Sequence, residues 1–248
     1  MLADLSGDDA LIVQTQIARA YGLRKDFTRA RELLRSLEPS LAGAGPEARI
    51  RHALEMGRTF SSAAHSPPSQ TPQAKESARA AYLRAFGLAK SASLDDLAID
   101  ALHMLAFVDT EPADQLKWAQ EALGVVLASS QPAARQWEGS IRNNIGYALH
   151  QLGRYDEALA EFQRAVGLRE AGGNAMAIRV AYWMVAWTLR ALNRIDDALE
   201  IQLRLEREGD RADAPDPYVL EELEQLYLLK ADAQRARHYA ERRQAIRP

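Results

Sequence analysis

The chain has 248 residues, and its 31 Lys and Arg against 34 Asp and Glu give a formal net charge of −3. It contains no cysteine, which excludes a disulfide framework, a thiolate zinc site and a cysteine nucleophile. The near-balanced charge argues against a dedicated nucleic-acid or membrane-surface binder, and no apolar run approaches the roughly 20 residues of a membrane span. The first nine residues lack the basic start and apolar core of a signal peptide, so we expect a cytoplasmic protein.

Alanine and leucine dominate the composition, and both are strong helix formers. β-branched residues are sparse, and no run alternates between apolar and polar residues as a half-buried strand does. The composition therefore predicts an all-α protein.

The first half of the chain predicts three helix pairs, at about 10–44, 46–91 and 93–128. In the first pair, the second helix should stop near Glu38-Pro39, because proline disfavours the helical conformation in the residue before it. In the second pair, residues 61–73 are rich in Ser and Pro and predict an exposed, mobile insertion.

The third pair is expected to open with a variant of the capping box, Ser93 with Asp96. Its second helix is expected to begin with Thr110 as the N-cap residue and Pro112 in the first turn. The register of the first helix stays open, since either His103 or Ala106 could fill the position at which the two helices approach closely.

The clearest helix pair is SIRNNIGYALHQLGRYDEALAEFQRAVGLRE, at residues 140–170 within a unit of about 133–170. It reads as two amphipathic helices joined by a tight turn at Gly153-Arg154. Small residues recur where two helix backbones would approach, at Gly146 and Ala148 on one helix and Ala158 and Ala165 on the other. The same template recurs at about 174–209 and 216–246, with Ala186, Ala198 and Ala236 in equivalent places.

This pattern resembles the tetratricopeptide repeat (TPR), with the matching residues Ile145, Gly146, Leu149, Gly153, Tyr155, Ala158, Phe162 and Ala165. The stretch from Asn143 to Gly146 is similar to the repeats of kinesin light chains and related bacterial regulators. The resemblance implies one domain over residues 1–248, a right-handed α-solenoid of about six TPR-like helix pairs with a concave inner face. A closed helical bundle is the alternative, but it would not explain why alanines recur at matching positions.

In the TPR family, the residues around Gly146 imply that Asn143, Asn144, Tyr147 and His150 point into the groove. An Asn side chain carries both a donor and an acceptor, so it can pair with the backbone amide of an extended peptide. The alternative is that both asparagines only bridge neighbouring helices or face solvent. The lysines that a chaperone-tail clamp of this family requires are not at the matching positions, which disfavours that specific ligand.

Two further groups of residues are candidates for the same groove. Trp183 and Trp187 lie one helical turn apart beside Arg190, and they could either line the groove or pack in the core. Arg19, Arg51 and Arg58 could hold a ligand carboxylate through paired hydrogen bonds, or they could be solvated surface charges.

Signatures of catalysis are absent from the sequence. It has no phosphate-binding loop, no dinucleotide fingerprint and no pair of histidines at metal-ligand spacing. We therefore expect no enzyme activity, no cofactor and no metal.

These observations predict a non-enzymatic scaffold that binds a protein or peptide in the concave groove, and neither nucleic acid nor a membrane. Two alternatives remain open at this point. One is a structural module that forms a homo-oligomer, and the other is a ligand-sensing regulatory protein that acts through a partner.

Overall fold

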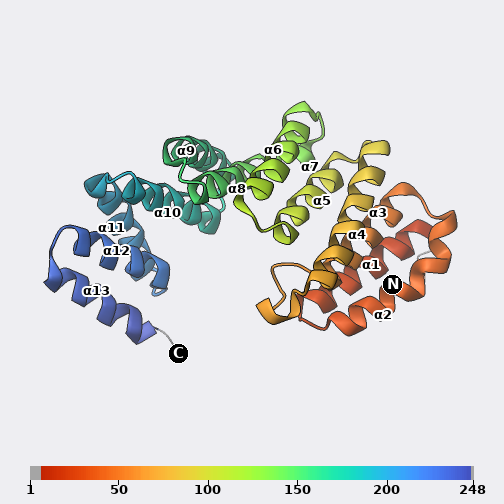
Figure 1. The fold of residues 1–248 in the computed structure, drawn as a ribbon, viewed down its shortest axis with the longest axis horizontal. Helices are drawn as coiled ribbons and strands as arrows, with labels where there is room; N and C mark the ends of the chain where they lie inside the picture. Colours follow the sequence, from red (N-terminus) through yellow and green to blue (C-terminus); the bar gives the residue numbers. More distant parts are fainter. Residues whose placement is uncertain (1–6, 247–248) are drawn as a thin grey trace. The chain divides into compact units, whose positions relative to one another are not determined.

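The computed structural model describes residues 7–246; the two ends of the predicted domain, residues 1–6 and 247–248, lie outside the described part. Within that part there are twelve long helices in six consecutive pairs, and there is no strand. The chain divides into two compact units, residues 1–141 and residues 142–248, which are described separately below (Figure 1). The helices are α1 (Gly7–Leu23), α2 (Phe27–Leu37), α3 (Pro46–Phe60), α4 (Pro72–Ser91), α5 (Asp95–Val108), α6 (Pro112–Ala128), the one-turn α7 (Pro132–Arg135), α8 (Glu138–Gln151), α9 (Tyr155–Gly172), α10 (Ala175–Ala191), α11 (Ile195–Arg211), α12 (Pro217–Leu229) and α13 (Ala233–Ile246).

One turn geometry recurs between helices along the chain. A residue two positions before the next helix takes a left-handed backbone conformation, and the following amide donates to a carbonyl five residues back, at 2.8–3.0 Å. This hydrogen bond closes the preceding helix in the manner of a Schellman motif. The left-handed residues are Lys25, Ser93, Gly153, Asn193 and Ala231. The recurrence explains why helix after helix reverses direction within a few residues.

Small side chains lie where paired helices touch. Ala158, Ala186, Ala198 and Ala236, which the repeat pattern marks, are all at most 3% exposed, and so are Ala18 and Ala30 of the first helix pair. Two glycines face a buried aromatic ring of the partner helix, Gly57 facing Tyr82 and Gly146 facing Phe162. The predicted all-α repeat architecture is therefore confirmed at the level of its helix contacts.

The first unit stacks α1 to α6 in sequence, so that each helix packs against the next one. The second helix of the first pair, α2, ends at Leu37 as expected, and a 3₁₀ turn follows over Glu38–Gly43. On α5, His103 and Ala106 are the two candidates for the position at which the helices of the third pair approach closely. Neither of them is fully buried. Ala101 of the same helix is fully buried.

The start of the segment 61–73 corrects one expectation. Ser61 and Ser62 are buried rather than exposed, because the Tyr82 hydroxyl donates to the Ser61 carbonyl at 2.8 Å and the Ser61 hydroxyl donates to Gln70 Oε1 at 2.9 Å. The His65 ring stacks on Phe27 with ring centres 3.8 Å apart. The following residues, 66–69, are exposed.

Two of the predicted helix caps are wrong. Ser93 does not cap α5; it is the left-handed turn residue, and Leu94 takes the N-cap position without a side-chain hydrogen bond. Thr110 does not cap α6 either, since the N-cap residue is Glu111 and Pro112 follows it at the first helical position. At α6 the fixed φ of Pro112 suits the first helical position, whereas α5 begins directly after the left-handed turn at Ser93.

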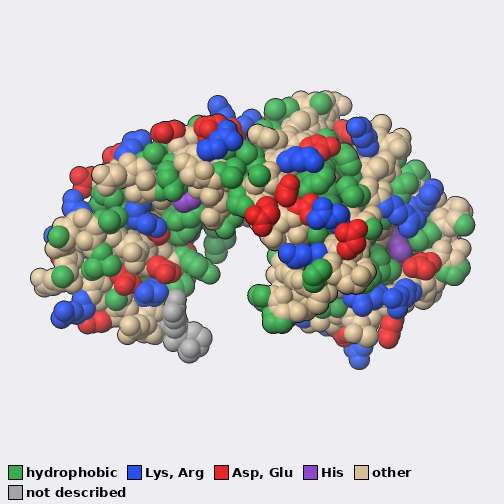
Figure 2. Space-filling view, viewed as in Figure 1, with side chains coloured by type: hydrophobic (Ala, Val, Ile, Leu, Met, Phe, Trp, Pro, Cys, Tyr) green, Lys and Arg blue, Asp and Glu red, His purple; other side chains and the backbone are tan. Residues whose placement is uncertain are grey.

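The second unit contains α9 to α13 and most of α8. Helix pairs α8/α9, α10/α11 and α12/α13 follow one another, and the first helices α8, α10 and α12 are linked by ring contacts and an ion pair. Figure 2 shows acidic and basic side chains interspersed over both units on the face drawn. None of the helices within residues 7–246 combines the length and apolar character that crossing a membrane would require.

Candidate binding surfaces

An unbroken series of aromatic contacts joins the first helices of the second unit. The His150 ring of α8 stacks on Trp187 of α10 with ring centres 3.4 Å apart, and Tyr147 lies 6.0 Å from the same indole. Trp187 stacks in turn on Trp183 at 5.8 Å, and Trp183 meets Tyr218 of α12 edge-on at 6.4 Å. We call these five residues the aromatic face. Trp183 and Trp187 are each half-buried.

A pocket of about 230 Å³ opens beside Trp183, between α10, α11 and α12. Met176, Val180 and Tyr218 line it and are 68%, 44% and 66% exposed, which is unusual for side chains of this size. Leu205 and Val219 form its buried floor. The pocket is therefore an apolar depression with exposed apolar walls.

The α8 end of the aromatic face holds a neutral histidine. Partial burial, and secondarily the positive charge of Arg190, lower the pKa of His150 to about 4. Its Nε2 atom is buried without a hydrogen-bond partner in the described part of the chain. At neutral pH the ring is thus uncharged, as stacking against an indole favours.

Arg190 already holds a carboxylate of the chain itself. Its Nε and Nη2 atoms donate to the two carboxylate oxygens of Glu222, both at 2.8 Å, and Glu222 is buried. These hydrogen bonds raise the pKa of Arg190 above its ordinary value against the opposing effect of burial. The pair ties α10 to α12 and fixes the guanidinium plane.

The two asparagines lie on α8, where the sequence places them beside Tyr147. Asn143 and Asn144 are both half-buried, and Asn144 has an interaction within the chain. Next to them, Arg142 donates to Glu161 of α9 at 2.9 Å, which anchors α8 to its partner helix. These residues belong to the same unit as the aromatic face.

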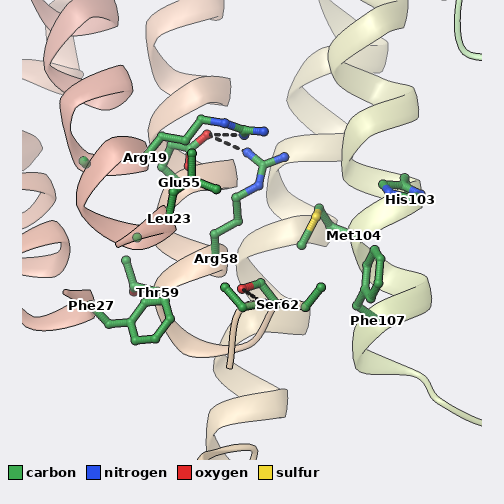
Figure 3. A pocket seen from close by; sticks show the side chains of 14 residues that line it. Arg19, Leu23, Phe27, Glu55, Arg58, Thr59, Ser62, His103, Met104 and Phe107 are labelled. Atoms are coloured by element: carbon green, nitrogen blue, oxygen red, sulfur yellow. Dashed lines mark hydrogen bonds and ion pairs between the residues drawn. The ribbon is translucent and has the colours of Figure 1, made fainter. Parts of the chain in front are cut away.

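The three N-terminal arginines lie in the first unit, where two of them share one carboxylate. Glu55 accepts from Arg19 at 3.1 Å and from Arg58 at 2.5 Å (Figure 3). Arg58 also donates to both oxygens of Asp100, at 2.6 and 2.7 Å. Arg51 instead pairs with Glu47 one turn before it, at 2.8 Å.

This network controls the charge of Arg58. Burial lowers the pKa of Arg58, but the carboxylates of Asp100 and Glu55 outweigh burial and raise it above its ordinary value. Arg58 is therefore a fixed cation whose terminal nitrogens bind carboxylates of the chain. Arg19 differs, because its side chain is 42% exposed and makes one ion pair.

Sequence reasoning missed the acidic partners and part of the apolar lining. Glu222 and Asp100 lie 32 and 42 residues from the arginines that they bind, so that no local pattern indicates them. Met176 and Tyr218 had a weak signal, since each is a large apolar residue in the first turn of a predicted helix. Among the described residues, no group of three or more His, Cys, Asp or Glu is arranged to hold a metal ion.

Comparison with known proteins identifies a repeat family in part of the chain. A family model described as tetratricopeptide repeat matches residues 137–206, which includes α8, α9 and α10. No curated protein matches the sequence.

Several solved structures share the fold. One is a Signal Transduction ATPase with Numerous Domains (STAND) protein with a tetratricopeptide repeat sensor from Pyrococcus horikoshii, at a TM-score of 0.75 and 13% identity. The similarity covers 98% of this chain and 37% of that protein, so that the chain spans little more than a third of its length. The apo form of RapI matches at a TM-score of 0.74 and 12% identity, over 94% of this chain and 81% of that one.

BtubC (BKLC) from P. vanneervenii matches at a TM-score of 0.68 and 16% identity, over 96% of this chain and 91% of that one. At these identities the structural likeness establishes the fold alone. Residues 137–206 match the tetratricopeptide repeat model, and the repeated turns and alanine contacts continue the same helix-pair pattern along the described chain: the protein has the fold of a tetratricopeptide repeat solenoid.

Proposed function

We propose that the protein is a non-enzymatic scaffold that binds a protein or peptide segment on the face of α8, α10 and α12. The tetratricopeptide repeat family supports a role in protein interaction in general. The observation that carries the choice of face is the aromatic face with the exposed apolar pocket beside it.

The exposure of this face supports binding rather than a purely structural role. Met176 and Tyr218 are about two-thirds exposed, although burying such side chains would be favourable by about 1.5–3 kcal/mol each. Trp and Tyr residues are also the side chains that most often dominate binding energy at interfaces. An apolar side chain of the partner would enter the pocket between Val180 and Tyr218.

Polar groups around the aromatic face would orient the partner. In this proposal Asn143 and Asn144 pair with backbone amides of the bound segment. Arg190 keeps its Nη1 group for an acidic group of the ligand, since Nε and Nη2 bind Glu222.

A random-peptide display library panned against the full chain tests the proposal. Enriched peptides, measured by fluorescence anisotropy, should bind the wild type and lose at least about tenfold in affinity for Val180→Glu, a change of about 1.4 kcal/mol or more. Leu127→Glu serves as a matched control, because Leu127 has similar exposure on α6 of the other unit. Equal binding to wild type and Val180→Glu, or enrichment of no peptide, would contradict the proposed face.

The homo-oligomer alternative makes a different prediction for the same face. If the aromatic face joined two copies of the chain, light scattering would give a mass near twice 27.5 kDa that Val180→Glu reduces to the monomer. A monomeric mass for both the wild type and Val180→Glu would support a face that is free to bind a partner. The name of the STAND protein describes its own repeats as a sensor; a ligand-sensing role for this chain would require a partner to carry the signal onward.

A further inference from the structure

A second cavity lies in the first unit, apart from the aromatic face. It has a volume of about 250 Å³, is open to solvent on one side, and is lined by α1, α3, α5, the first residue of α2 and residues 62–64 (Figure 3). Ligand pockets typically measure about 300–1,000 Å³. At about 250 Å³ this cavity lies just below that range, which limits its ligand to a small organic molecule.

The walls of this cavity are mainly apolar and partly aromatic. Phe27 comes from α2, Met104 and Phe107 project from α5, and Leu23 lies at the rim on α1 (Figure 3). Leu23 is 71% exposed, whereas Met104 is 6% exposed and forms a fixed part of the wall. Phenyl rings and a thioether contact aromatic groups favourably, through edge-to-face and sulfur–aromatic interactions.

The polar wall of the cavity carries a guanidinium with donors that are unoccupied in the described part of the chain, that of Arg19. Of its three charged side chains, Arg19 and Arg58 are cations and Glu55 is an anion that both of them bind. Asp100 occupies the other terminal nitrogen of Arg58. The donors of Arg19 beyond Nη1 have no partner among residues 7–246, and its side chain is 42% exposed.

We propose that this cavity binds a small aromatic carboxylic acid, with its carboxylate on Arg19 and its ring between Phe27, Met104 and Phe107. The free edge of the guanidinium can hold both carboxylate oxygens, which an isolated ammonium could not do in a planar arrangement. Glu55, itself held by Arg58, orients Arg19. The site lies in the first unit and does not depend on the aromatic face.

Calorimetric titration of the full chain with 3-phenylpropanoate tests the assignment. Two analogues of the same shape, 3-phenylpropan-1-ol and 3-phenylpropylamine, serve as neutral and cationic controls. The carboxylate should bind at least about tenfold more tightly than either analogue. Equal binding of the alcohol, or no heat with the carboxylate, would overturn the proposal.

Matched variants locate the binding. Arg19→Gln should weaken 3-phenylpropanoate at least about tenfold, whereas Arg29→Gln, which removes another surface guanidinium of the same helix pair, should leave it unchanged. Leu23→Ser removes an exposed rim side chain without disturbing the ion pairs and should weaken the acid and the alcohol alike. Circular dichroism checks that each variant is folded, and an unchanged affinity in both Arg19→Gln and Leu23→Ser would exclude this cavity. Peptide binding by the aromatic face should be unaffected in all three variants.

Discussion

A Cβ atom placed on Gly146 would lie 2.7 Å from Cε1 of Phe162, closer than van der Waals contact with a ring that is completely buried. The same relationship recurs in the first unit, where a Cβ on Gly57 would lie 2.5 Å from the Tyr82 ring. Both glycines sit in the middle of a helix, where glycine is otherwise unfavourable. The repeat therefore retains glycine because the partner helix brings an aromatic ring against its backbone.

Gly146→Ala should destabilise the protein although alanine is the better helix former. The gain in helix propensity is about 1 kcal/mol, and overpacking against the immobile Phe162 ring costs about 1–3 kcal/mol. Urea denaturation should therefore show a lower free energy of unfolding.

Gly167→Ala is the matched control for this substitution. Gly167 lies on the partner helix α9, and a Cβ atom added there would meet nothing within 4 Å, so the same change should stabilise by up to about 1 kcal/mol. Stabilisation by both substitutions would show that the Phe162 ring can move aside.

The left-handed turn residues predict a pair of opposite effects. Ala231 has φ +56°, which costs an L-residue about 1 kcal/mol. Ala231→Gly should therefore raise the free energy of unfolding by about 0.5–1 kcal/mol, if the native backbone is kept.

Gly153→Ala, at the equivalent turn, should lower the free energy of unfolding. Gly153 has φ +74° and no atom within 4 Å of an added Cβ, so that only backbone strain acts there. Urea denaturation of the wild type, Ala231→Gly and Gly153→Ala measures these changes. If both variants shifted the free energy of unfolding in the same direction, the two turns would not share one geometry.

Arg58→Leu should lower the free energy of unfolding by about 3 kcal/mol, because it leaves the largely buried Asp100 without its cation and the buried Glu55 with Arg19 alone. The double variant Arg58→Leu with Asp100→Leu should recover part of that loss. Arg154→Gln removes one partner of the exposed pair with Glu157 and should leave the free energy of unfolding nearly unchanged, because solvent screens that pair. Similar losses in Arg58→Leu and Arg154→Gln would show that burial does not strengthen the network.

The lowered pKa of His150 predicts a dependence of stability on pH. The native ring titrates near pH 4 and the unfolded ring near 6.5, so the unfolded state binds the proton first as the pH falls. The contribution of His150 to stability is therefore complete above about pH 6.5 and is lost as the pH falls toward 4.

His150→Phe isolates this contribution while keeping a ring against Trp187. The loss of melting temperature between pH 7 and pH 4.5 should be smaller in the variant than in the wild type. The comparison is needed because burial also lowers the pKa values of His52, His65 and His103. Identical pH profiles would mean that Arg190 and the neighbouring rings do not hold His150 neutral.

Local pattern determined the helix pairs, their turns and the alanine contacts of this protein. Gly153, Tyr155 and Ala158 follow one another within six residues, and both the helical period and the left-handed turn act over that distance. For that reason the end of α2 and the burial of Ala158 could be predicted, and their equivalents recur along the chain.

Only the tertiary structure decided which side chains meet across helix pairs. It paired Arg58 with Asp100 and Arg190 with Glu222, so that arginines expected to hold a ligand bind carboxylates of the chain. It left Arg19 with free donors beside an apolar cavity. The physical reason is that these contacts join residues more than 30 positions apart, and their geometry depends on how successive pairs stack, which no local spacing in the sequence encodes.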